Sequence, residues 1–212
     1  MTVTLIRLSA REEDRVAVTF EIRSGEHTHI ETFVVSAFRV ADLSLCRGES
    51  TQECYDAVSM VAQLDQAVEK GLHLLGYGSS SRRALVRKLT ERGFSQEIAA
   101  AAAEELCRQG YLNEEAQAVR EAERCVEKLW GEKRIVVALR AKGYSSESIK
   151  RALFTIEDEE VDFEEVCAER IRRYMRELPS DPRERQKWMA ALSRYGFSAS
   201  QIRGALNRLF CE

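Results

Sequence analysis

Basic side chains form the most regular pattern of chemically active residues in this chain. They occur in three clusters, and each cluster precedes a glycine that is followed by an aromatic residue. The clusters consist of Arg82, Arg83 and Arg87, of Lys133, Arg134 and Arg140, and of Arg183, Arg185 and Lys187. Guanidinium and ammonium groups bind phosphates and carboxylates through charge-assisted hydrogen bonds. Solvated helix faces explain such clusters most simply, but their recurrence also fits a contact surface for an acidic protein or for DNA.

The residues needed for catalysis or for cofactor binding are sparse. The chain contains three histidines, His27, His29 and His73, and no serine or cysteine lies in a recognisable nucleophile motif. His27 and His29 could share one side of a strand, but no further histidine or cysteine has metal-ligand spacing nearby. The glycine-rich motifs that cradle phosphates are absent from the sequence too. We therefore expect no enzyme, no cofactor and no metal site.

Charge and composition limit the class of protein. Residues 1–65 carry 6 basic and 11 acidic side chains, and residues 66–212 carry 26 basic and 24 acidic ones. This near balance argues against a histone-like protein that bulk charge holds on DNA. The first residues lack the apolar core of a signal peptide, and the longest apolar run is too short to span a membrane. We expect a cytosolic protein whose six dispersed cysteines are free thiols.

A small sheet is predicted near the start of the chain. Residues 16–23 alternate apolar and polar side chains, which is the period of a half-buried strand. The β-branched and aromatic segment 29–35 predicts a return strand after a short turn, and residues 3–8 are a third candidate strand. Ser50 and Glu53 have the spacing of a capping box, so a helix is predicted to begin there.

From about residue 65 the apolar residues follow the period of a helix, and a repeated motif marks the helix ends. In five places a leucine stands four residues before a glycine that precedes an aromatic residue. The copies are Leu72/Gly76/Tyr77, Leu89/Gly93/Phe94, Leu106/Gly110/Tyr111, Leu139/Gly143/Tyr144 and Leu192/Gly196/Phe197. This spacing predicts Schellman ends, in which the glycine takes the left-handed conformation and the next residue packs against the leucine.

Residues that start helices follow these turns. Ser95, Ser145 and Ser198 stand at positions where an N-cap is needed, and Asn113 does so after another turn. Ser198 and Gln201 have the spacing of a capping box. The repeated object is therefore a helix end, a tight turn and a helix start.

The spacing of the turns predicts the architecture. The copies around Gly93, Gly143 and Gly196 lie 50 and 53 residues apart, which gives room for three short helices in each repeat. We expect a mainly α protein of three tandem three-helix repeats, arranged like a solenoid, after a small β-rich N-terminal extension. The predicted boundaries are 1–64 for the extension with one helix, and 65–112, 113–160 and 161–212 for the three modules.

The helical part of the sequence resembles the RecX regulatory proteins of bacterial recombination. The resemblance covers residues 66–210 and rests on three segments in the family's order and spacing. They are "GYLNEEA" at 110–116, "LWGEKRIVVALRAKGYSSESI" at 129–149 and "DPRERQKWMAALSRYGFSASQIRGAL" at 181–206. Asn113 and Glu114 stand where the family usually has two aspartates. The β-rich start is similar to the extension found in a subset of the family.

The resemblance implies a protein that acts by binding a partner and has no enzymatic activity. Members of the family are tandem three-helix repeats that bind the RecA recombinase filament on single-stranded DNA. They restrain its ATPase, strand-exchange and coprotease activities. On this basis the nine basic residues named above are candidate contacts with RecA or DNA. We expect a monomeric, cytoplasmic regulator of DNA repair and the SOS response. The alternative function is a DNA-binding protein with tandem helix-turn-helix modules.

Overall fold

A computed structural model describes residues 2–12, 14–43, 45, 48–78, 80–158, 161–174 and 181–210, with the backbone alone for Glu49, Ser50 and Phe210. The chain divides into two compact units. Unit 1 comprises Met1–Gly78 and Leu85–Tyr111, and unit 2 comprises Ser79–Ala84 and Leu112–Glu212.

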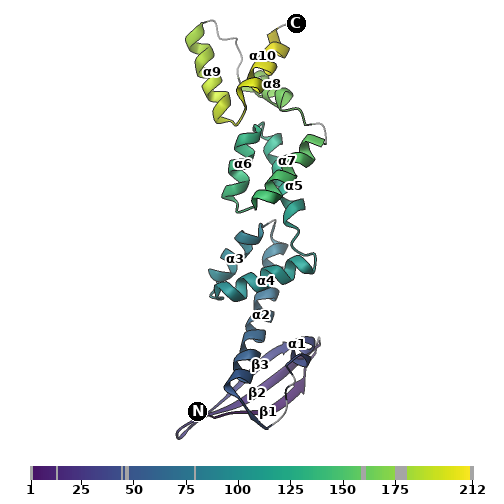
Figure 1. The fold of residues 1–212 in the computed structure, drawn as a ribbon, viewed down its shortest axis with the longest axis vertical. Coiled ribbons are helices and arrows are strands. Elements are labelled where there is room, and N and C mark those ends of the chain that lie inside the picture. Colours follow the sequence, from purple (N-terminus) through teal and green to yellow (C-terminus); the bar gives the residue numbers. More distant parts are fainter. Residues whose placement is uncertain are drawn as a thin grey trace. The chain divides into compact units, whose positions relative to one another are not determined.

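Helices make up most of the described residues, and Figure 1 labels them in chain order. They are α1 (Ala37–Ala41), α2 (Gln52–Gly76), α3 (Arg82–Thr90), α4 (Gln96–Arg108), α5 (Glu114–Glu127), α6 (Glu132–Ala141), α7 (Ser146–Asp158), α8 (Phe163–Tyr174), α9 (Pro182–Arg194) and α10 (Ala199–Phe210). Four strands precede α2. They are β1 (Thr2–Ala10), β2 (Arg15–Ser24), β3 (His27–Ser36) and β4 (Gly48–Ser50).

The strands form one antiparallel sheet in unit 1, in the order β3-β2-β1-β4. Side chains alternate between the two faces of a strand, so Leu5, Val18 and Phe20 share one face, where all three are buried. The predicted hairpin and the third predicted strand are therefore confirmed. No sequence pattern predicted β4, whose pairing with β1 completes the sheet.

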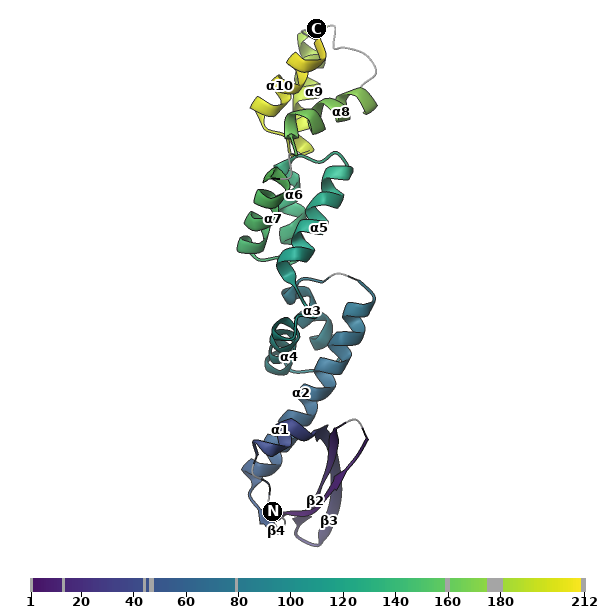
Figure 2. The ribbon, with the colours of Figure 1, turned by 90° about the vertical axis from the view of Figure 1, so that its right-hand side faces the viewer.

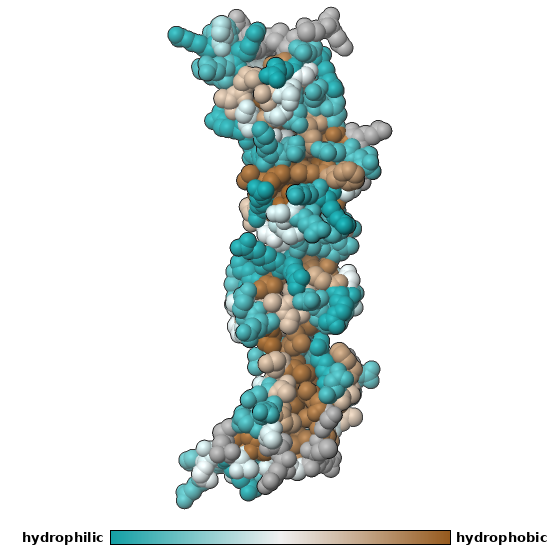
Figure 3. Space-filling model, in the orientation of Figure 1, coloured by the Kyte–Doolittle hydropathy of each residue, from teal (hydrophilic) through white to brown (hydrophobic). Residues whose placement is uncertain are grey.

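Helix α2 covers the apolar face of this sheet. Its Val58 and Ala62 belong to the same core cluster as the buried sheet residues. The ring of Tyr55 packs in edge-to-face geometry against the rings of Phe20 and Phe33, whose centroids lie 5.4 and 5.5 Å from its own. Hydrophobic surface is visible where α2 runs beside the sheet (Figure 3). The β-rich extension thus has a core of its own, to which α2 contributes one side.

The start and the length of α2 both differ from the prediction. Ser50 lies in β4, and the side chain of Thr51 caps the helix by accepting a hydrogen bond from the Cys54 N–H at 3.2 Å. The helix then continues for 25 residues to Gly76. No proline interrupts it, and its apolar face continues past Ala67. The predicted boundary between residues 64 and 65 therefore falls inside a continuous helix.

Three of the predicted Schellman ends are formed in full. At Gly93, Gly143 and Gly196, φ is +95°, +85° and +97°. The N–H of the next residue donates to the carbonyl of the predicted leucine at 3.4, 3.2 and 3.3 Å, respectively. Gly110 also has a positive φ of +80°, but Tyr111 after it is 58% exposed. The backbone turn is thus present at Gly110 without a buried aromatic side chain.

The fifth predicted Schellman turn, at Gly76, is wrong, although α2 does end at this residue. Gly76 is still part of α2, and Tyr77 after it is right-handed, with φ of −87°, and 80% exposed. The positive φ falls instead on Gly78, at +152°. Because two glycines flank the tyrosine, the chain can turn at the second one, and Tyr77 does not fold back on Leu72.

The helix starts predicted after the repeated turns are confirmed. Ser95, Asn113 and Ser145 each accept a hydrogen bond from the N–H three residues further on, at 3.2, 3.0 and 3.1 Å. The Gln201 N–H donates to the Ser198 hydroxyl at 3.2 Å, and the Ser198 N–H donates to the Gln201 side chain at 2.8 Å. This reciprocal pair is the predicted capping box.

Three groups of three helices follow one another along the chain (Figure 2). The first and third helices of each group make the most extensive contacts, which join α2 to α4, α5 to α7 and α8 to α10. Ala102, Ala152 and Ala205 lie at the same offset after the three full Schellman turns, and all three are completely buried. The predicted fold class, three three-helix repeats after a small β-rich extension, is confirmed. The module boundaries themselves stay a prediction.

The described cysteines agree with the expectation of free thiols. Cys54, Cys107, Cys125 and Cys167 form no disulfide. Burial raises the pKa of the Cys167 thiol to about 12, so this side chain acts as a small apolar residue of the core. None of the described helices combines the length and the apolar character that crossing a membrane requires.

Candidate functional site

The nine basic residues predicted as contacts lie on α3, α6 and α9, one helix of each module. Eight of them are exposed, and Arg134 is half-buried. Arg87 lies 3.7 Å from Glu91 in an ion pair across one helical turn, which partly offsets its positive charge. The exposed members are therefore accessible to an anionic partner, while Arg134 takes part in a local stack.

One base occupies the same helical position in all three modules. Arg83, Lys133 and Arg183 are each the second residue of their helix, 50 residues apart along the chain, and all three are exposed. The first turn of a helix also carries the positive end of the helix dipole. Each module thus presents a positive side chain beside a positive helix end. The other six bases do not repeat at one position in this way.

Aromatic rings and cations gather in unit 2 at the start of α6. The Arg134 guanidinium lies 4.2 Å from the centroid of the Trp130 ring and 4.7 Å from that of Tyr195. The Arg170 guanidinium lies 3.1 and 4.9 Å from the centroids of Tyr195 and Tyr174. With Lys128, which lies 5.7 Å from the Trp130 centroid, these residues form what we call the aromatic–cation cluster. Its members are Lys128, Trp130, Arg134, Arg170, Tyr174 and Tyr195.

Arg170 is the buried member of this cluster, with 7% of its surface exposed. Its Nη1 donates to the carbonyls of Lys128 and Leu129 at 3.3 and 3.2 Å, so it satisfies groups at the end of α5. Burial lowers the pKa of its guanidinium below the usual value. Arg170 precedes no repeated turn, so the recurrence of bases did not predict its role. Its spacing from Phe163 and Cys167 places it on the buried face of α8, which could have indicated its role.

Two glycines let the backbone segments beside this cluster approach closely. The Gly131 N–H donates to the Tyr195 carbonyl at 2.8 Å, and the Lys133 N–H donates to the Gly196 carbonyl at 3.2 Å. A Cβ atom on Gly131 would lie 2.6 Å from the Gly196 oxygen, and one on Gly196 would lie 2.6 Å from Arg134 Cβ. The N-terminus of α6 therefore packs on the turn after α9 only because both positions lack a side chain.

Glu114 has a structural role in unit 2. Its Oε2 accepts a hydrogen bond from the Arg82 N–H at 3.0 Å. Its Oε1 accepts from the Ser145 N–H at 2.9 Å and from the Ser148 hydroxyl at 3.2 Å. One carboxylate thus accepts hydrogen bonds at the starts of both α3 and α7. The first turn of a helix has N–H groups without intrahelical partners and a positive partial charge. This contact explains why an acidic residue is suited to the "GYLNEEA" segment.

We expect Glu114→Ala to lower the free energy of unfolding of unit 2 by about 2 kcal/mol, because two helix starts lose their acceptor. Glu115→Ala is the matched control. Its pair with Arg151 is 2.8 Å long but exposed, so its loss should cost less than about 1 kcal/mol. Urea unfolding of both variants measures the difference. Equal losses would show that Glu114 does not hold these helix starts.

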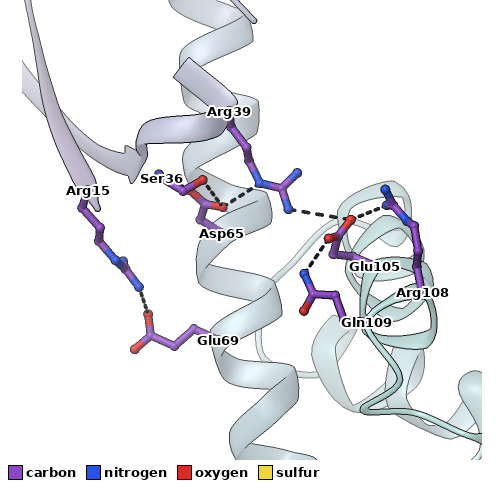
Figure 4. A network of polar contacts seen from close by, with 8 residues as sticks. All are labelled: Arg15, Ser36, Arg39, Asp65, Glu69, Glu105, Arg108 and Gln109. Carbon is purple, nitrogen blue, oxygen red and sulfur yellow. Dashed lines mark hydrogen bonds and ion pairs between the residues drawn. The ribbon is translucent and has the colours of Figure 1, made fainter. Parts of the chain in front are cut away.

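A network of polar and charged side chains connects β3, α1, α2 and α4 of unit 1 (Figure 4). Asp65 on α2 accepts a hydrogen bond from the Ser36 N–H at 2.6 Å and pairs with Arg39 Nε at 2.9 Å. Arg39 also lies 3.9 Å from the carboxylate of Glu105, which in turn pairs with Arg108 on α4. The side chains of Arg39, Asp65 and Glu105 are only 16%, 11% and 10% exposed. The network therefore links the end of β3, through α1 and α2, to the first helical module.

The histidine pair considered as a metal site lies on β3. His27 and His29 are exposed and pair with Ser24 and Ile22 of β2. In the part of the chain that the structure describes, no three histidine, cysteine or acidic side chains are placed to hold a metal ion. The sites described here are accordingly surfaces of charge and aromatic rings.

The fold and these surfaces define a class of protein: a helical repeat protein whose modules carry exposed basic and aromatic side chains. Comparison with known proteins narrows this class. Residues 160–206 match the family model of the third three-helix domain of RecX. The regulatory protein RecX of Halorhodospira halophila is 34% identical over 138 residues, which cover 65% of this chain and 84% of the relative. That of Stenotrophomonas maltophilia is 32% identical over 139 residues, or 65% and 83% of the two chains. The chain belongs to the RecX family.

Solved structures with the same fold extend over most of the chain. A crystal structure of regulatory protein RecX superposes with a TM-score of 0.70 at 22% identity, and the match covers 95% of this chain and 97% of that one. The RecX structure from Lactobacillus salivarius gives a TM-score of 0.61 at 20% identity, with 71% and 98% covered. At these identities the likeness is one of fold.

Proposed function

We propose that this protein binds filaments of the RecA recombinase on single-stranded DNA and restrains RecA's ATP hydrolysis, strand exchange and coprotease activity. Membership of a family whose members are named regulatory proteins supports the proposal. The observation that carries it is the exposed base at the second position of α3, α6 and α9. The protein would act as a cytoplasmic monomer in DNA repair and the SOS response.

Repetition is the physical reason for favouring a filament as the partner. A filament presents the same protomer surface at regular intervals, and a chain of repeated modules can make the same contact several times. Contacts that are individually weak then combine through their high effective concentration. The acidic surface of a protein partner and the phosphates of the DNA inside the filament are both suitable targets for the repeated bases.

We expect the triple variant Arg83→Glu, Lys133→Glu and Arg183→Glu to inhibit RecA about tenfold more weakly than the unchanged protein, because each module then repels an anionic surface. The measurement is RecA's ATP hydrolysis on single-stranded DNA with increasing amounts of the protein. Glutamate in the first turn of a helix is favourable to the helix dipole, so these changes should not unfold the modules.

The matched control reverses one exposed base elsewhere in each of the three modules: Lys70, Lys150 and Arg203. It changes the net charge by the same amount and should leave inhibition within about twofold of the original. If both triple variants inhibit as well as the unchanged protein, the repeated bases are not the contact. If both lose inhibition equally, net charge matters rather than position.

Direct DNA binding is the second candidate, because the same bases would suit phosphates. Salt separates the two functions, since DNA affinity falls linearly on logarithmic axes as salt rises. Inhibition of RecA well below one copy per protomer, at a salt concentration where the protein alone no longer binds DNA, would support the RecA proposal. No inhibition at equal amounts of the two proteins would contradict it and favour DNA binding.

A further inference from the structure

The aromatic–cation cluster borders an open pocket in unit 2. The pocket has a volume of about 430 Å³, and its described lining is Lys128, Trp130, Arg134, Arg170, Tyr174 and Tyr195. Three of these side chains are cationic, three are aromatic and none is acidic. The volume lies within the range of sites that take small ligands.

The positive charge of this pocket is not neutralised by the residues described around it. Within the described part of the chain, the guanidinium of Arg134 stacks on the rings of Trp130 and Tyr195. That of Arg170 contacts two tyrosine rings, hydrogen-bonds with the side chain of Tyr195 and donates to two backbone carbonyls. None of these partners carries a negative charge at neutral pH. A concave site with several unneutralised cations attracts anions more strongly than isolated surface bases do.

The repeat architecture does not require an aromatic residue and a base at the start of α6. Trp130 stands just before the N-cap Gly131, and Ser80 stands at the equivalent place before α3. Arg134 is the third residue of α6, where α3 has Ala84. The equivalent start of α3 is held by a different contact, since the Ser81 hydroxyl donates to the Lys142 carbonyl at 2.7 Å. A side-chain set found at one of two equivalent places points to a ligand rather than to packing.

Aromatic rings decide between the anions that could bind. Carboxylates of an acidic protein use the cations but gain little from exposed rings, whereas a nucleotide uses both through its phosphate and its base. Tyr174 is 62% exposed, so one face of its ring is open to a base. Lys128 is exposed as well and can reach a phosphate.

We propose that this pocket binds a nucleotide of single-stranded nucleic acid, with the base stacked on Tyr174 and the phosphate held by Lys128 and Arg134. This rests on the second candidate function, direct DNA binding, and deepens it by giving it a particular pocket and a single-stranded target; the contact requires no RecA. It also differs from the repeated bases, which act through charge alone and would bind the backbone without stacking.

Tryptophan fluorescence tests the proposal, because the chain has two tryptophans and one of them is Trp130. A Trp188→Phe variant leaves Trp130 as the only emitter, and a short oligothymidylate is the probe. We expect saturable quenching. In that background Tyr174→Ala should weaken binding about tenfold, the usual loss when one base loses its stacking ring. Lys128→Ala should lower the slope of log affinity against log salt by about 0.7, the value for one phosphate of a single strand.

Tyr111→Ala is the matched control, since Tyr111 is also an exposed tyrosine, at 58%, but lies in unit 1. Unchanged Trp130 emission, or equal affinity of the Tyr174→Ala and Tyr111→Ala variants, would overturn the proposal. Quenching by polyglutamate but not by the oligonucleotide would also overturn it and assign the pocket to an acidic protein. Fluorescence polarisation of a labelled oligonucleotide gives the same comparison with both tryptophans intact. Because this assay contains no RecA, a negative result in it is distinct from a failure of the protein to inhibit RecA.

Discussion

Replacing Gly196 by alanine is expected to destabilise unit 2 by more than about 3 kcal/mol. The left-handed conformation costs an alanine about 1–2 kcal/mol. Because the φ of Gly196 is +97°, this conformational penalty is one part of the lost stability. The larger part comes from the new Cβ, which would lie 2.6 Å from the Gly131 carbonyl oxygen and 2.6 Å from Arg134 Cβ. Both neighbours are held by backbone hydrogen bonds, so the N-terminus of α6 must separate from the turn.

The other Schellman glycines provide a graded control for this prediction. A Cβ on Gly93, where φ is +95°, would meet nothing within 4 Å, so Gly93→Ala should cost only the conformational penalty. A Cβ on Gly143 would lie 3.0 Å from the Ser81 hydroxyl and should give an intermediate loss. Urea unfolding of the three variants measures the series. Equal losses would mean that conformation alone, and not the close approach at Gly196, sets the cost.

Arg170→Ala is expected to lower the free energy of unfolding of unit 2 by about 3 kcal/mol. The change removes a charged donor from two carbonyls at the end of α5 and empties the space between two tyrosine rings. The change should also disturb the backbone at Leu129. Its left-handed φ of +56° is unfavourable, and one of the lost hydrogen bonds holds its carbonyl in place.

Arg172, two residues further along α8, is the matched control for Arg170. It pairs with Glu165 at 2.7 Å and with Glu169 at 3.4 Å, but it is 47% exposed. Arg172→Ala should therefore cost less than about 1 kcal/mol. Thermal unfolding of both variants, followed by circular dichroism, makes the comparison. A loss at Arg172 as large as that at Arg170 would contradict the role given to the buried guanidinium.

Features determined by neighbours in the sequence were predicted well. A serine two residues after a left-handed glycine caps the next helix by accepting a hydrogen bond from the N–H three residues further on. Ser145 does so after Gly143. The alternation of apolar and polar side chains in residues 16–23 is likewise a local pattern, and it predicted which side chains share one face of the sheet. The error at Gly76 arose because two glycines compete for one turn, and the motif alone does not show which one the chain uses.

Features determined by contacts distant in the sequence were not predicted. Arg170 gains its role from carbonyls 41 and 42 residues earlier, and Glu114 from N–H groups 31 and 32 residues away. The basic residues of the candidate site were found from their recurrence alone. Eight of them are exposed, while Arg134 lies in a stack that requires Tyr195, 61 residues further along the chain. Which of the nine contact a partner stays a prediction.

Because α2 is one continuous helix, it fixes how the β-rich extension is rotated about the helix axis relative to the first module. Its Val58 and Ala62 face the sheet, and Gly71 packs against Leu106 of α4, with Asp65 joined to the charged network between them. An α-helix turns by about 100° per residue. Inserting one residue after Asp65 would therefore swing the sheet about a third of the way around the helix axis. Only insertions near a whole number of turns preserve the setting, so relatives with this extension should differ in α2 length by about seven residues or not at all.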